Sequence, residues 1–366
     1  IAMKHPTPQL VADSALPVPA ATDERLRPVG AWRRLLGRPE SGALSGALLI
    51  FLVFGLCASG SGMFSAEGIV NWATVAGFLG VIAVGAALLM VAGEFDLSMG
   101  SMIGFAGMLF AVPCLYWGWP VWLAALFALA VACALGALNG WLVVKTGLPS
   151  FIVTLAFYFV LRGLSLALSV LLTGKTILSS HGPADGFNLL AQAGIVAARD
   201  DGTALAIGIP KVVVWWLALT AVGAFVLARM RVGNWILAVG GDPLAAKNVG
   251  IPVGRVKIAL FMLTAACATL FAILQVADAG SAAADRGLQK EFEAIIAAVI
   301  GGCLLTGGYG SVLGAGLGAL IFGVVQIGIG YTSIDNNWYR VFLGGMLLVA
   351  VLFNNYVRRR VALGRR

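Results

Sequence analysis

The sequence carries little charge for its length. Only 11% of its 366 residues are Asp, Glu, Lys or Arg, whereas 60% are hydrophobic. A soluble domain has about 25% charged residues, so this chain could not cover its surface with polar groups in water. Together with a mean hydropathy of +0.96, this argues against soluble domains and predicts an all-α, polytopic transmembrane helical bundle surrounded by membrane lipid.

The residues that build metal, redox and catalytic sites are also scarce. Five cysteines are scattered without metal-binding or redox spacing, and we interpret them as apolar filler. His5 and His181 lie far apart in polar segments, so we predict no metal site. The Gly-Lys-Thr triplet at 174–176 lacks the earlier glycine of a phosphate-binding loop, because Ser169 stands in that place. With no dinucleotide motif or Ser/His/Asp grouping either, the sequence predicts neither an enzyme nor a cofactor bound by this chain.

Long apolar runs alternate with short polar segments from residue 43 onward. About 20 apolar residues cross a hydrocarbon layer about 30 Å thick, and runs near this length recur about ten times. The predicted membrane helices, two of them short, lie near 43–60, 69–92, 98–113, 121–143, 150–173, 212–229, 258–277, 292–305, 311–330 and 339–357. The sequence thus predicts a tail of residues 1–42, a transmembrane domain of residues 43–357 and a basic tail of residues 358–366.

The basic residues set the predicted orientation. If the N-terminus is cytoplasmic and the spans alternate, most of the 24 Lys and Arg residues fall on the cytoplasmic side. This agrees with the positive-inside rule and places both termini in the cytoplasm. It also assigns the net charge of +8 to a membrane surface rather than to nucleic acid. Residues 174–211 then form the main external loop, and residues 230–257 form the main cytoplasmic loop.

The cytoplasmic loop carries the signals of a short helix. Asp242 is suited to cap the helix, and Pro243 is suited to its first position. Gly250 and Pro252 follow about two turns later and predict its end. A short helix held on the cytoplasmic face is a shape that a soluble partner can bind, although an ordinary connecting loop is the alternative.

Two acidic residues, Glu94 and Asp96, lie between apolar runs in the stretch VAGEFDLSMGSMIG (91–104). A charge at bilayer depth is costly and therefore usually faces a partner or a cavity. Asp96 is placed to cap the helix that follows, which does not exclude a role in transport. The glycines of this stretch favour a broken helix, and transporters place polar ligand contacts at such breaks.

Arg162 lies in the middle of an apolar run, too deep to reach the membrane surface easily. We expect it to face a carboxylate, a group of carbonyl oxygens or water, with Asp96 and Glu94 as candidate partners. The sequence does not decide between these alternatives.

A late glycine-rich segment, residues 301–323, is predicted to pack closely against another helix. Gly310, Gly314 and Gly318 recur every four residues and give a smooth helix face. The Gly307–Gly308 pair before this face predicts a tight turn.

Four stretches carry a family resemblance. They are GEFDLSMGSMIGFAGM (93–108), LNGWLVVKTGLPSFIVTLAFYFVLRGLSL (138–166), GNWILAVGGDPLAAKNVGI (233–251) and EFEAIIAAVIGGCLLTGGYGSVLGAGLGALIFG (291–323). In order and length they resemble the membrane permease subunit of bacterial ABC sugar importers of the ribose, xylose and galactose type. Lys247–Asn248 and residues 277–292 depart from the family pattern, which leaves the cargo undetermined.

The resemblance implies a multi-pass permease of the bacterial inner membrane that forms the translocation path for a monosaccharide or similar small polar solute. ATP and Mg would be bound by a separate ABC ATP-binding subunit, and a periplasmic solute-binding protein would deliver the cargo. A second copy of the chain would complete a homodimer. The cytoplasmic helix would couple the permease to the ATPase, through Gly240, Gly241, Asp242, Ala245, Ala246 and Gly250.

A path for a neutral, hydroxyl-rich solute needs amides, hydroxyls and aromatic rings with few charges. The residues assigned to this path are Glu94, Asp96, Ser98, Asn139, Thr154, Tyr158 and Arg162. Asn71, Ser165 and Gln326 offer further polar groups within the spans.

Three other functions stay open on the residues alone. An ion- or proton-coupled secondary transporter also needs a broken helix and buried ionisable groups. A membrane-embedded enzyme would need a catalytic grouping, and a passive channel would work without ATP. The structured loop at 233–251, which a self-contained carrier does not need, favours the ATP-driven importer.

Overall fold

The computed structural model describes residues 39–58, 60–179, 197–198, 204–205, 210–332 and 334–363. Helices dominate this part of the chain. They are α2 (Pro39–Cys57), α3 (Ala66–Val91), α4 (Ser98–Tyr116), α5 (Val121–Thr146), α6 (Ser150–Thr173), α8 (Lys211–Arg229), α9 (Arg231–Gly241), α10 (Pro243–Asn248), α11 (Val253–Ala279), α12 (Lys290–Ile300), α13 (Val312–Gly330), the short 3-10 helix η2 (Asn336–Trp338) and α14 (Tyr339–Leu363). Strand β1 (Ile177–Ser179) pairs antiparallel with β4 (Ser281–Ala283), and β2 (Ala197–Ala198) with β3 (Ala204–Leu205).

Among the described helices, eight are long and apolar enough to cross a membrane: α2, α3, α4, α5, α6, α8, α11 and α13. Two predicted spans differ from these. The span expected at 292–305 corresponds to α12, whose 11 residues rise only about 17 Å, and α14 has an apolar part limited to Tyr339–Leu352. The all-α membrane bundle is confirmed, whereas the number of crossings and the orientation of the termini stay predictions.

Small residues bring the central helices together. In the most apolar window of both α3 and α4, 83% of residues are buried, against 22% in α5 and 17% in α6. α5 packs on α11 through glycines: a Cβ at Gly136 would lie 2.5 Å from the Phe261 carbonyl oxygen, and one at Gly140 would lie 2.7 Å from the Ile258 Cα. In a membrane, where lipid is as apolar as leucine, such close backbone approach supplies packing energy.

The glycine face predicted for α13 packs against α12. A Cβ at Gly314 would lie 1.8 Å from the Gly301 carbonyl oxygen, and one at Gly318 would lie 2.0 Å from the Ala297 carbonyl oxygen. Any larger residue at these positions would push the helices apart, so the predicted packing role is confirmed. Gly307 and Gly308 both have a φ of +76°, as expected for a tight turn.

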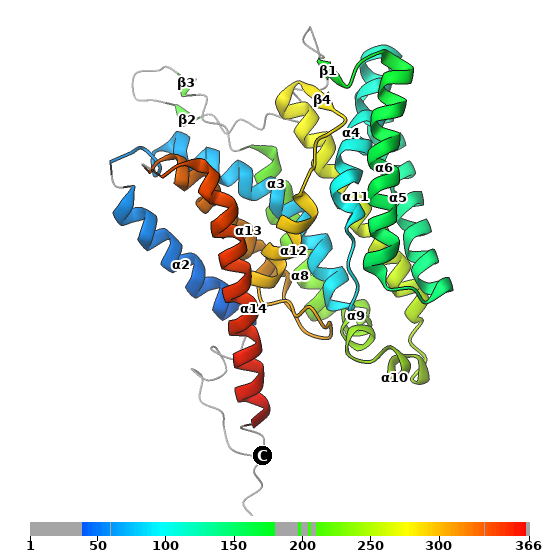
Figure 1. The fold of residues 1–366 in the computed structure, drawn as a ribbon, viewed down its shortest axis with the longest axis vertical. Coiled ribbons are helices and arrows are strands. Elements are labelled where there is room, and N and C mark those ends of the chain that lie inside the picture. The colour runs from blue at the N-terminus through cyan, green and yellow to red at the C-terminus, as the bar shows by residue number, and fades with distance from the viewer. Residues whose placement is uncertain are drawn as a thin grey trace, which may run out of the picture. The chain divides into compact units, whose positions relative to one another are not determined.

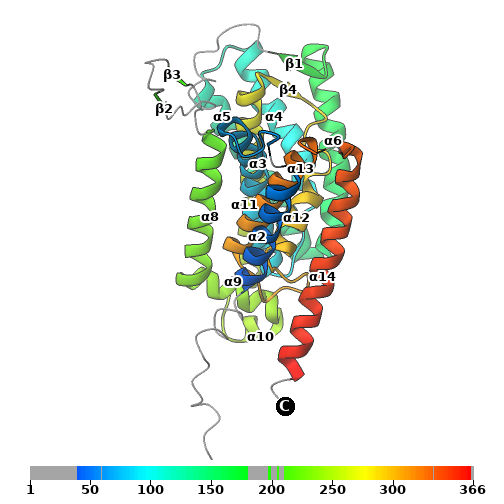
Figure 2. The ribbon, with the colours of Figure 1, turned by 90° about the vertical axis from the view of Figure 1, so that its left-hand side faces the viewer.

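The two ends of the bundle carry different elements. The helices α9 and α10 and the C-terminal part of α14 lie at one end, and β1 and β4 lie at the other (Figures 1 and 2). The loop predicted to be cytoplasmic and the strand that opens the predicted external loop are therefore at opposite ends. α14 continues to Leu363, into the tail predicted at 358–366. Most of the predicted external loop and of the predicted N-terminal tail, together with His5 and His181, lies outside the described residues.

All five cysteines lie in the described part of the chain and are unpaired. Cys267 and Cys303 are buried, Cys114 and Cys133 are half-buried, and Cys57 is exposed at the end of α2. Within the described residues, no group of three or more His, Cys, Asp and Glu side chains could hold a metal ion.

Candidate functional site

A non-helical segment, residues 92–97, separates α3 from α4, and we call it the break. Gly93 turns the chain out of α3 with a φ of +82°, a conformation that favours glycine. Its N–H donates to the Met90 carbonyl (2.9 Å), and the Glu94 N–H donates to the Leu89 carbonyl (3.2 Å). These two bonds form a Schellman motif, which satisfies carbonyls that the end of α3 would otherwise leave unpaired. The broken helix that the glycines predicted is confirmed.

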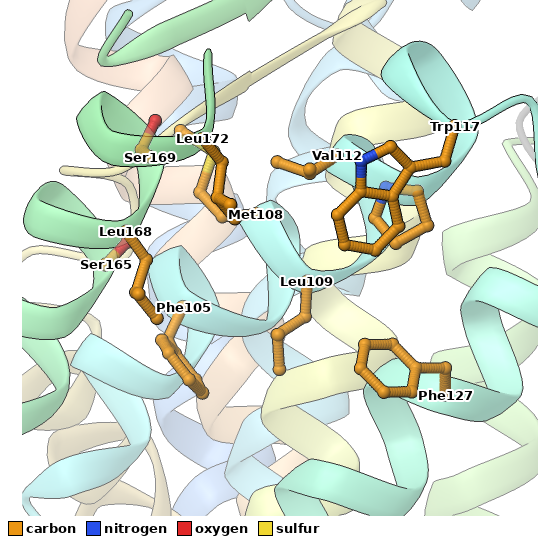
Figure 3. Close-up of a pocket in the computed structure, with 11 residues that line it drawn as sticks. Phe105, Met108, Leu109, Val112, Trp117, Phe127, Ser165, Leu168, Ser169 and Leu172 are labelled. Atoms are coloured by element: carbon orange, nitrogen blue, oxygen red, sulfur yellow. The ribbon is translucent and has the colours of Figure 1, made fainter. Parts of the chain in front are cut away.

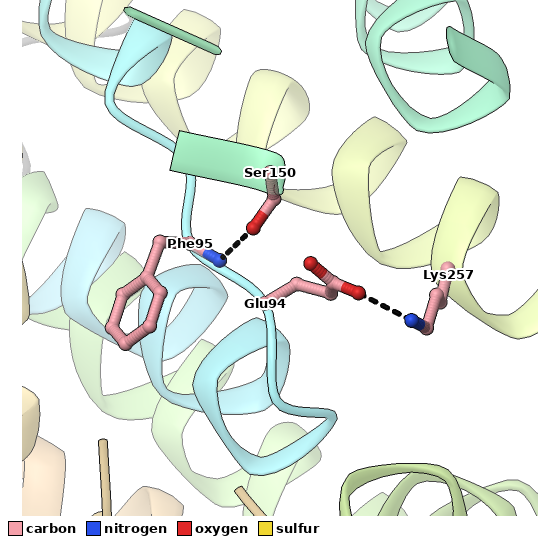
Figure 4. Close-up of polar contacts among 4 residues, drawn as sticks. All are labelled: Glu94, Phe95, Ser150 and Lys257. Carbon is pink, nitrogen blue, oxygen red and sulfur yellow. Dashed lines mark hydrogen bonds and ion pairs between the residues drawn. The ribbon is translucent and has the colours of Figure 1, made fainter. Parts of the chain in front are cut away.

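Hydroxyl groups of α6 hold the backbone of the break. The Phe95 N–H donates to Ser150 Oγ at 3.0 Å (Figure 4), and the Leu97 N–H donates to Thr154 Oγ1 at 3.1 Å. Ser150 and Thr154 are four residues apart and so lie on one face of α6. Because a buried N–H without a partner costs free energy, these two hydroxyls stabilise a backbone that lacks helical hydrogen bonds.

Asp96 is the centre of a buried polar network, which we call the Asp96 network: Asp96, Ser98, Asn139 and Thr264. Asp96 Oδ1 accepts from the Ser98 N–H (2.9 Å) and hydroxyl (2.5 Å), and Oδ2 accepts from the Thr264 hydroxyl (2.5 Å). The Asn139 amide donates to Ser98 Oγ (3.0 Å), while its Oδ1 has no hydrogen-bond partner within the described residues. Asp96 is 4% exposed and the other three are 1% exposed or less. The network therefore joins the break to α4, α5 and α11.

Asp96 thus accepts the first helical N–H of α4, as a capping residue would, but from one position before the N-cap residue Leu97, whose own side chain makes no capping bond. Thr264 was missed by the sequence analysis. It is one threonine in the apolar run of α11, and only the packing of α11 against the break distinguishes it from its neighbours.

Glu94 forms an ion pair at the start of the break. Its Oε1 accepts from Lys257 Nζ, and the side chains of Lys257 and Glu94 are 17% and 11% exposed (Figure 4). Lys257 lies in the second turn of α11. Lys257 is the last residue of the loop predicted to be cytoplasmic, and the sequence does not show its pairing because its partner is 163 positions away.

Arg162 lies apart from the break. Its Nη1 donates to the carbonyl oxygens of Ala284 and Arg286, both at 3.5 Å. Of the three partners expected for this buried guanidinium, the structure shows carbonyl oxygens rather than the carboxylates of Asp96 or Glu94. Arg162 therefore fixes the segment between β4 and α12 to α6.

That segment rests on glycines of α4. A Cβ at Gly104 would lie 2.7 Å from the Ala284 carbonyl oxygen, and one at Gly100 would lie 1.8 Å from Glu291 Oε2. Glu291 is 1% exposed, and its Oε2 has no hydrogen-bond partner among the described residues. The sequence analysis did not select Glu291, although an acid at the head of the apolar run EFEAIIAAVI could have marked it.

The residues predicted for a path separate into two groups. Five are gathered at the break: Glu94, Asp96, Ser98, Asn139 and Thr154. Arg162 is at the segment described above, and Tyr158 lies on α6 with its ring 5.4 Å from that of the exposed Phe159. The role of all seven in transport stays a prediction.

The short helix in the cytoplasmic loop forms as predicted. Asp242 Oδ1 accepts from the Leu244 N–H (2.9 Å) and the Ala245 N–H (3.0 Å), which caps α10 directly before Pro243. Gly250 has a φ of +85° and follows the end of the helix. This local structure is confirmed because each of its signals acts within a few residues.

The exposed side of α10 presents two large apolar side chains next to the exposed polar residues Lys247 and Asn248. Leu244 is 75% exposed and Val249, just beyond the helix, is 77% exposed, whereas Ala246 is 3% exposed and packs into the core. The predicted coupling residues Gly241, Asp242, Ala245 and Gly250 are also exposed, and Gly240 is half-buried. Leu244 and Val249 were missed because the sequence alone does not show which side of so short a helix faces the bundle.

A small pocket lies between α4, α5 and α6, and its lining is apolar. Phe105, Trp117 and Phe127 contribute rings to it (Figure 3). Its two hydroxyls already donate to backbone carbonyls: Ser165 to Ala284 and Ser169 to Lys175. The pocket therefore offers little to a hydroxyl-rich solute, and the polar groups of the break are better suited to one.

Known proteins are similar to this chain over a range that includes both the break and α10. Residues 68–351 match the family described as branched-chain amino acid transport system / permease component. The chain is 28% identical over 385 residues to the xylose transport system permease protein XylH of Escherichia coli (strain K12), covering 89% of this chain and 97% of that protein. It is 34% identical over 287 residues to the inner membrane ABC transporter permease protein YjfF of the same strain, covering 78% and 83%. It is 32% identical over 278 residues to the ribose import permease protein RbsC of that strain, covering 75% and 81%.

Proposed function

Because the chain belongs to the family of permease components of branched-chain amino acid transport systems, we propose that it is the permease subunit of an ABC importer for a monosaccharide. It is a multi-pass protein of the bacterial inner membrane. The family description names amino acids, whereas XylH and RbsC are named for the pentoses xylose and ribose. The similarity to these two relatives supports a sugar as the cargo.

The single observation in the fold that carries this proposal is the exposed apolar surface of α10. Leu244 in the capped helix α10 and Val249 just beyond it are exposed to solvent. α10 lies at the same end of the bundle as α9. Burial of a leucine or valine side chain contributes about 1.5–3 kcal/mol, so two such side chains can anchor a protein partner. The proposed partner is a separate ABC ATP-binding subunit, which would bind ATP and Mg itself.

The break is the proposed polar element of the translocation path. The Asp96 network gathers a carboxylate, an amide and two hydroxyls at one place between α4, α5 and α11. A second copy of the chain would complete the path as a homodimer. A periplasmic solute-binding protein would deliver the solute at the end of the bundle that carries β1 and β4.

The proposal is tested by uptake in cells that express the chain together with its ATP-binding subunit and binding protein. We expect uptake of radiolabelled xylose or ribose that is lost when the ATPase is inactivated. Uptake that persists without the ATPase would overturn the proposal in favour of an ion-coupled carrier or a channel. ATP-dependent uptake of leucine but of neither pentose would overturn the sugar cargo alone.

We call Leu244 and Val249 the docking surface, and its role in binding the ATPase subunit is tested by the same substitution at two exposed leucines. Leu244→Ala removes an anchor from α10, whereas Leu48→Ala makes the same change on α2, where Leu48 is 64% exposed. An anchor in a protein interface is worth more than about 1 kcal/mol, so Leu244→Ala should weaken binding of the ATPase subunit at least about fivefold. Leu48→Ala should leave that binding unchanged. Equal binding by both variants would remove α10 as the docking element.

A further inference from the structure

Three backbone segments from distant parts of the chain meet at the end of α9. We call this contact the glycine junction, and it consists of Gly93, Gly240, Gly307 and Gly308. A Cβ at Gly240 would lie 1.8 Å from the Val91 carbonyl oxygen and 2.5 Å from the Gly308 nitrogen. A Cβ at Gly307 would lie 2.7 Å from the Gly93 Cα and 2.8 Å from the Gly240 carbonyl oxygen. The three segments therefore touch through backbone atoms, with no side chain between them.

A hydrogen bond closes the glycine junction. The Gly308 N–H donates to the Val91 carbonyl at 2.8 Å, and the positive φ of Gly308 aims the N–H there. A Cβ at the neighbouring Gly241 would meet nothing within 4 Å, so the junction excludes a side chain at Gly240 but leaves room for one at Gly241. Closely packed protein interiors are poorly compressible and transmit displacement, so α9 cannot shift at this point without moving its neighbours.

The glycine junction connects the proposed docking helix to the break. Gly240 precedes Asp242, the residue that caps α10, by two residues, because α9 ends at Gly241. Gly93 begins the turn into the break and precedes Asp96 by three residues. The docking surface and the Asp96 network are far apart in the sequence. Through the contact between Gly240 and the Gly93 turn, only a few residues separate them.

A second link reaches the break from the other side of α10. Lys257, in α11, pairs with Glu94 (Figure 4). α10 is followed directly by α11, so the elements on both sides of α10 hold the break, α9 through backbone contact and α11 through an ion pair. A displacement of α10 would therefore act on the break from two directions.

The break itself is suited to change position. The N–H groups of Phe95 and Leu97 donate to the side-chain hydroxyls of Ser150 and Thr154 rather than to a helical ladder. Such bonds can be exchanged one at a time, whereas a helix resists stepwise change because each bond supports the next. The Asp96 network would move with this segment.

We propose that the glycine junction and the Glu94–Lys257 pair transmit the position of α10 to the break, so that ATP-driven movement of the docked subunit repositions the Asp96 network. This inference rests on the proposed function. It makes Gly240, Glu94 and Lys257 positioning residues, which set the coupling between ATP hydrolysis and transport rather than contact the solute. Coupling of this kind requires two arrangements of one element that both sites influence.

The test measures solute transported per ATP hydrolysed by the complete complex reconstituted in vesicles, with radiolabelled xylose or ribose as the solute. Gly240→Ala should keep the ATPase bound and active while the ratio falls at least about fivefold, the lower end of measured couplings between sites. Gly241→Ala should lower the ratio less, because its added methyl group contacts nothing. Gly330→Ala, an open position at the end of α13, is the control and should leave the ratio unchanged. An unaltered ratio in Gly240→Ala would overturn the role of the junction.

Reversing the charges of Glu94 and Lys257 gives a second test, which does not depend on close packing. It tests the proposed coupling even if the Gly240→Ala protein fails to insert into the membrane. Glu94→Lys and Lys257→Glu should each lower the ratio, and the double variant should restore most of it. A double variant no better than the worse single variant would overturn the second link. If ATP-driven uptake continues with the wild-type ratio in every variant, only this inference fails. Uptake that needs no ATP would instead overturn the proposed function.

Discussion

Asp96 and Asp242 perform the same local task in different surroundings. Each carboxylate accepts the backbone N–H of the residue two positions later and begins a helix with it. Asp242 is exposed and accepts from two backbone N–H groups of its own helix. Asp96 is 4% exposed and also binds side chains that join three helices. A capping aspartate at the surface sets one helix, whereas a buried one also sets the positions of its neighbours.

The largest expected effect is that of Asp96→Ala. The substitution leaves the Ser98 N–H and hydroxyl and the Thr264 hydroxyl without an acceptor in a buried place. Unsatisfied buried groups cost about 1–3 kcal/mol each, and we expect a loss of about 3–5 kcal/mol of unfolding free energy. Chemical denaturation of the purified protein in detergent measures this. Asp96→Asn, which keeps an acceptor at the same place, should lose clearly less, and an equal loss would argue against the hydrogen bonds as the cause.

Thr264→Val tests one arm of the Asp96 network. The side chain keeps its shape but no longer donates to Asp96 Oδ2. Leaving the buried Oδ2 without this donor costs about 1–3 kcal/mol, and the same denaturation experiment should show a loss in this range. Thr269→Val is a matched control on α11, because the Thr269 hydroxyl donates to the Ala265 carbonyl of its own helix. A smaller loss for Thr264→Val than for this control would contradict the network.

Asp242→Ala should have a smaller and more local effect. Loss of a helix N-cap costs about 0.5–2 kcal/mol, and here the cost falls on α10. We expect faster amide hydrogen exchange in residues 244–249 with little change in α4 or α11. Faster exchange throughout the bundle would show that Asp242 supports more than its own helix, and the contrast with Asp96 would fail.

The smallest expected effect on stability is that of Glu94→Gln. Glu94 is two residues from Asp96 and nearly as buried, 8% against 4% exposed, but its ion pair is with one flexible lysine rather than with several groups of the bundle. Glutamine keeps an oxygen that can accept from Lys257 Nζ, and the lysine stem can carry its charge toward water, so we expect a salt-dependent loss of about 1 kcal/mol. A loss as large as that of Asp96→Ala would show that the set of hydrogen-bond partners does not explain the difference between the two acids.

The sequence was sufficient for features whose causes lie within a few residues. Asp242, Pro243 and Gly250 predicted α10, and the glycine face of α13 predicted a packing role. Gly93, Gly100 and Gly104 favoured a break or a close contact, and the structure has the break at Gly93 and close contacts at Gly100 and Gly104. The membrane bundle followed from composition, since few structures can bury so apolar a chain.

Partners distant in the sequence could not be predicted. Ser150 binds the break across 55 positions, and Thr264 binds Asp96 across 168. The carbonyl groups that Arg162 contacts are 122 and 124 positions away, and a carbonyl carries no signature in the sequence. The exposure of Leu244 and the burial of Ala246 depend in the same way on how α10 lies against the bundle.

The distribution of thiols makes the chain convenient for spectroscopy. An alkylating dye applied to the intact protein reaches Cys57 first, because Cys267 and Cys303 are sealed from solvent. Cys57→Ser would therefore remove the most accessible thiol, and Cys114→Ser with Cys133→Ser would remove the two half-buried ones. A fluorophore attached to one new cysteine beside Val249 could then report the motion of α10 during each transport cycle.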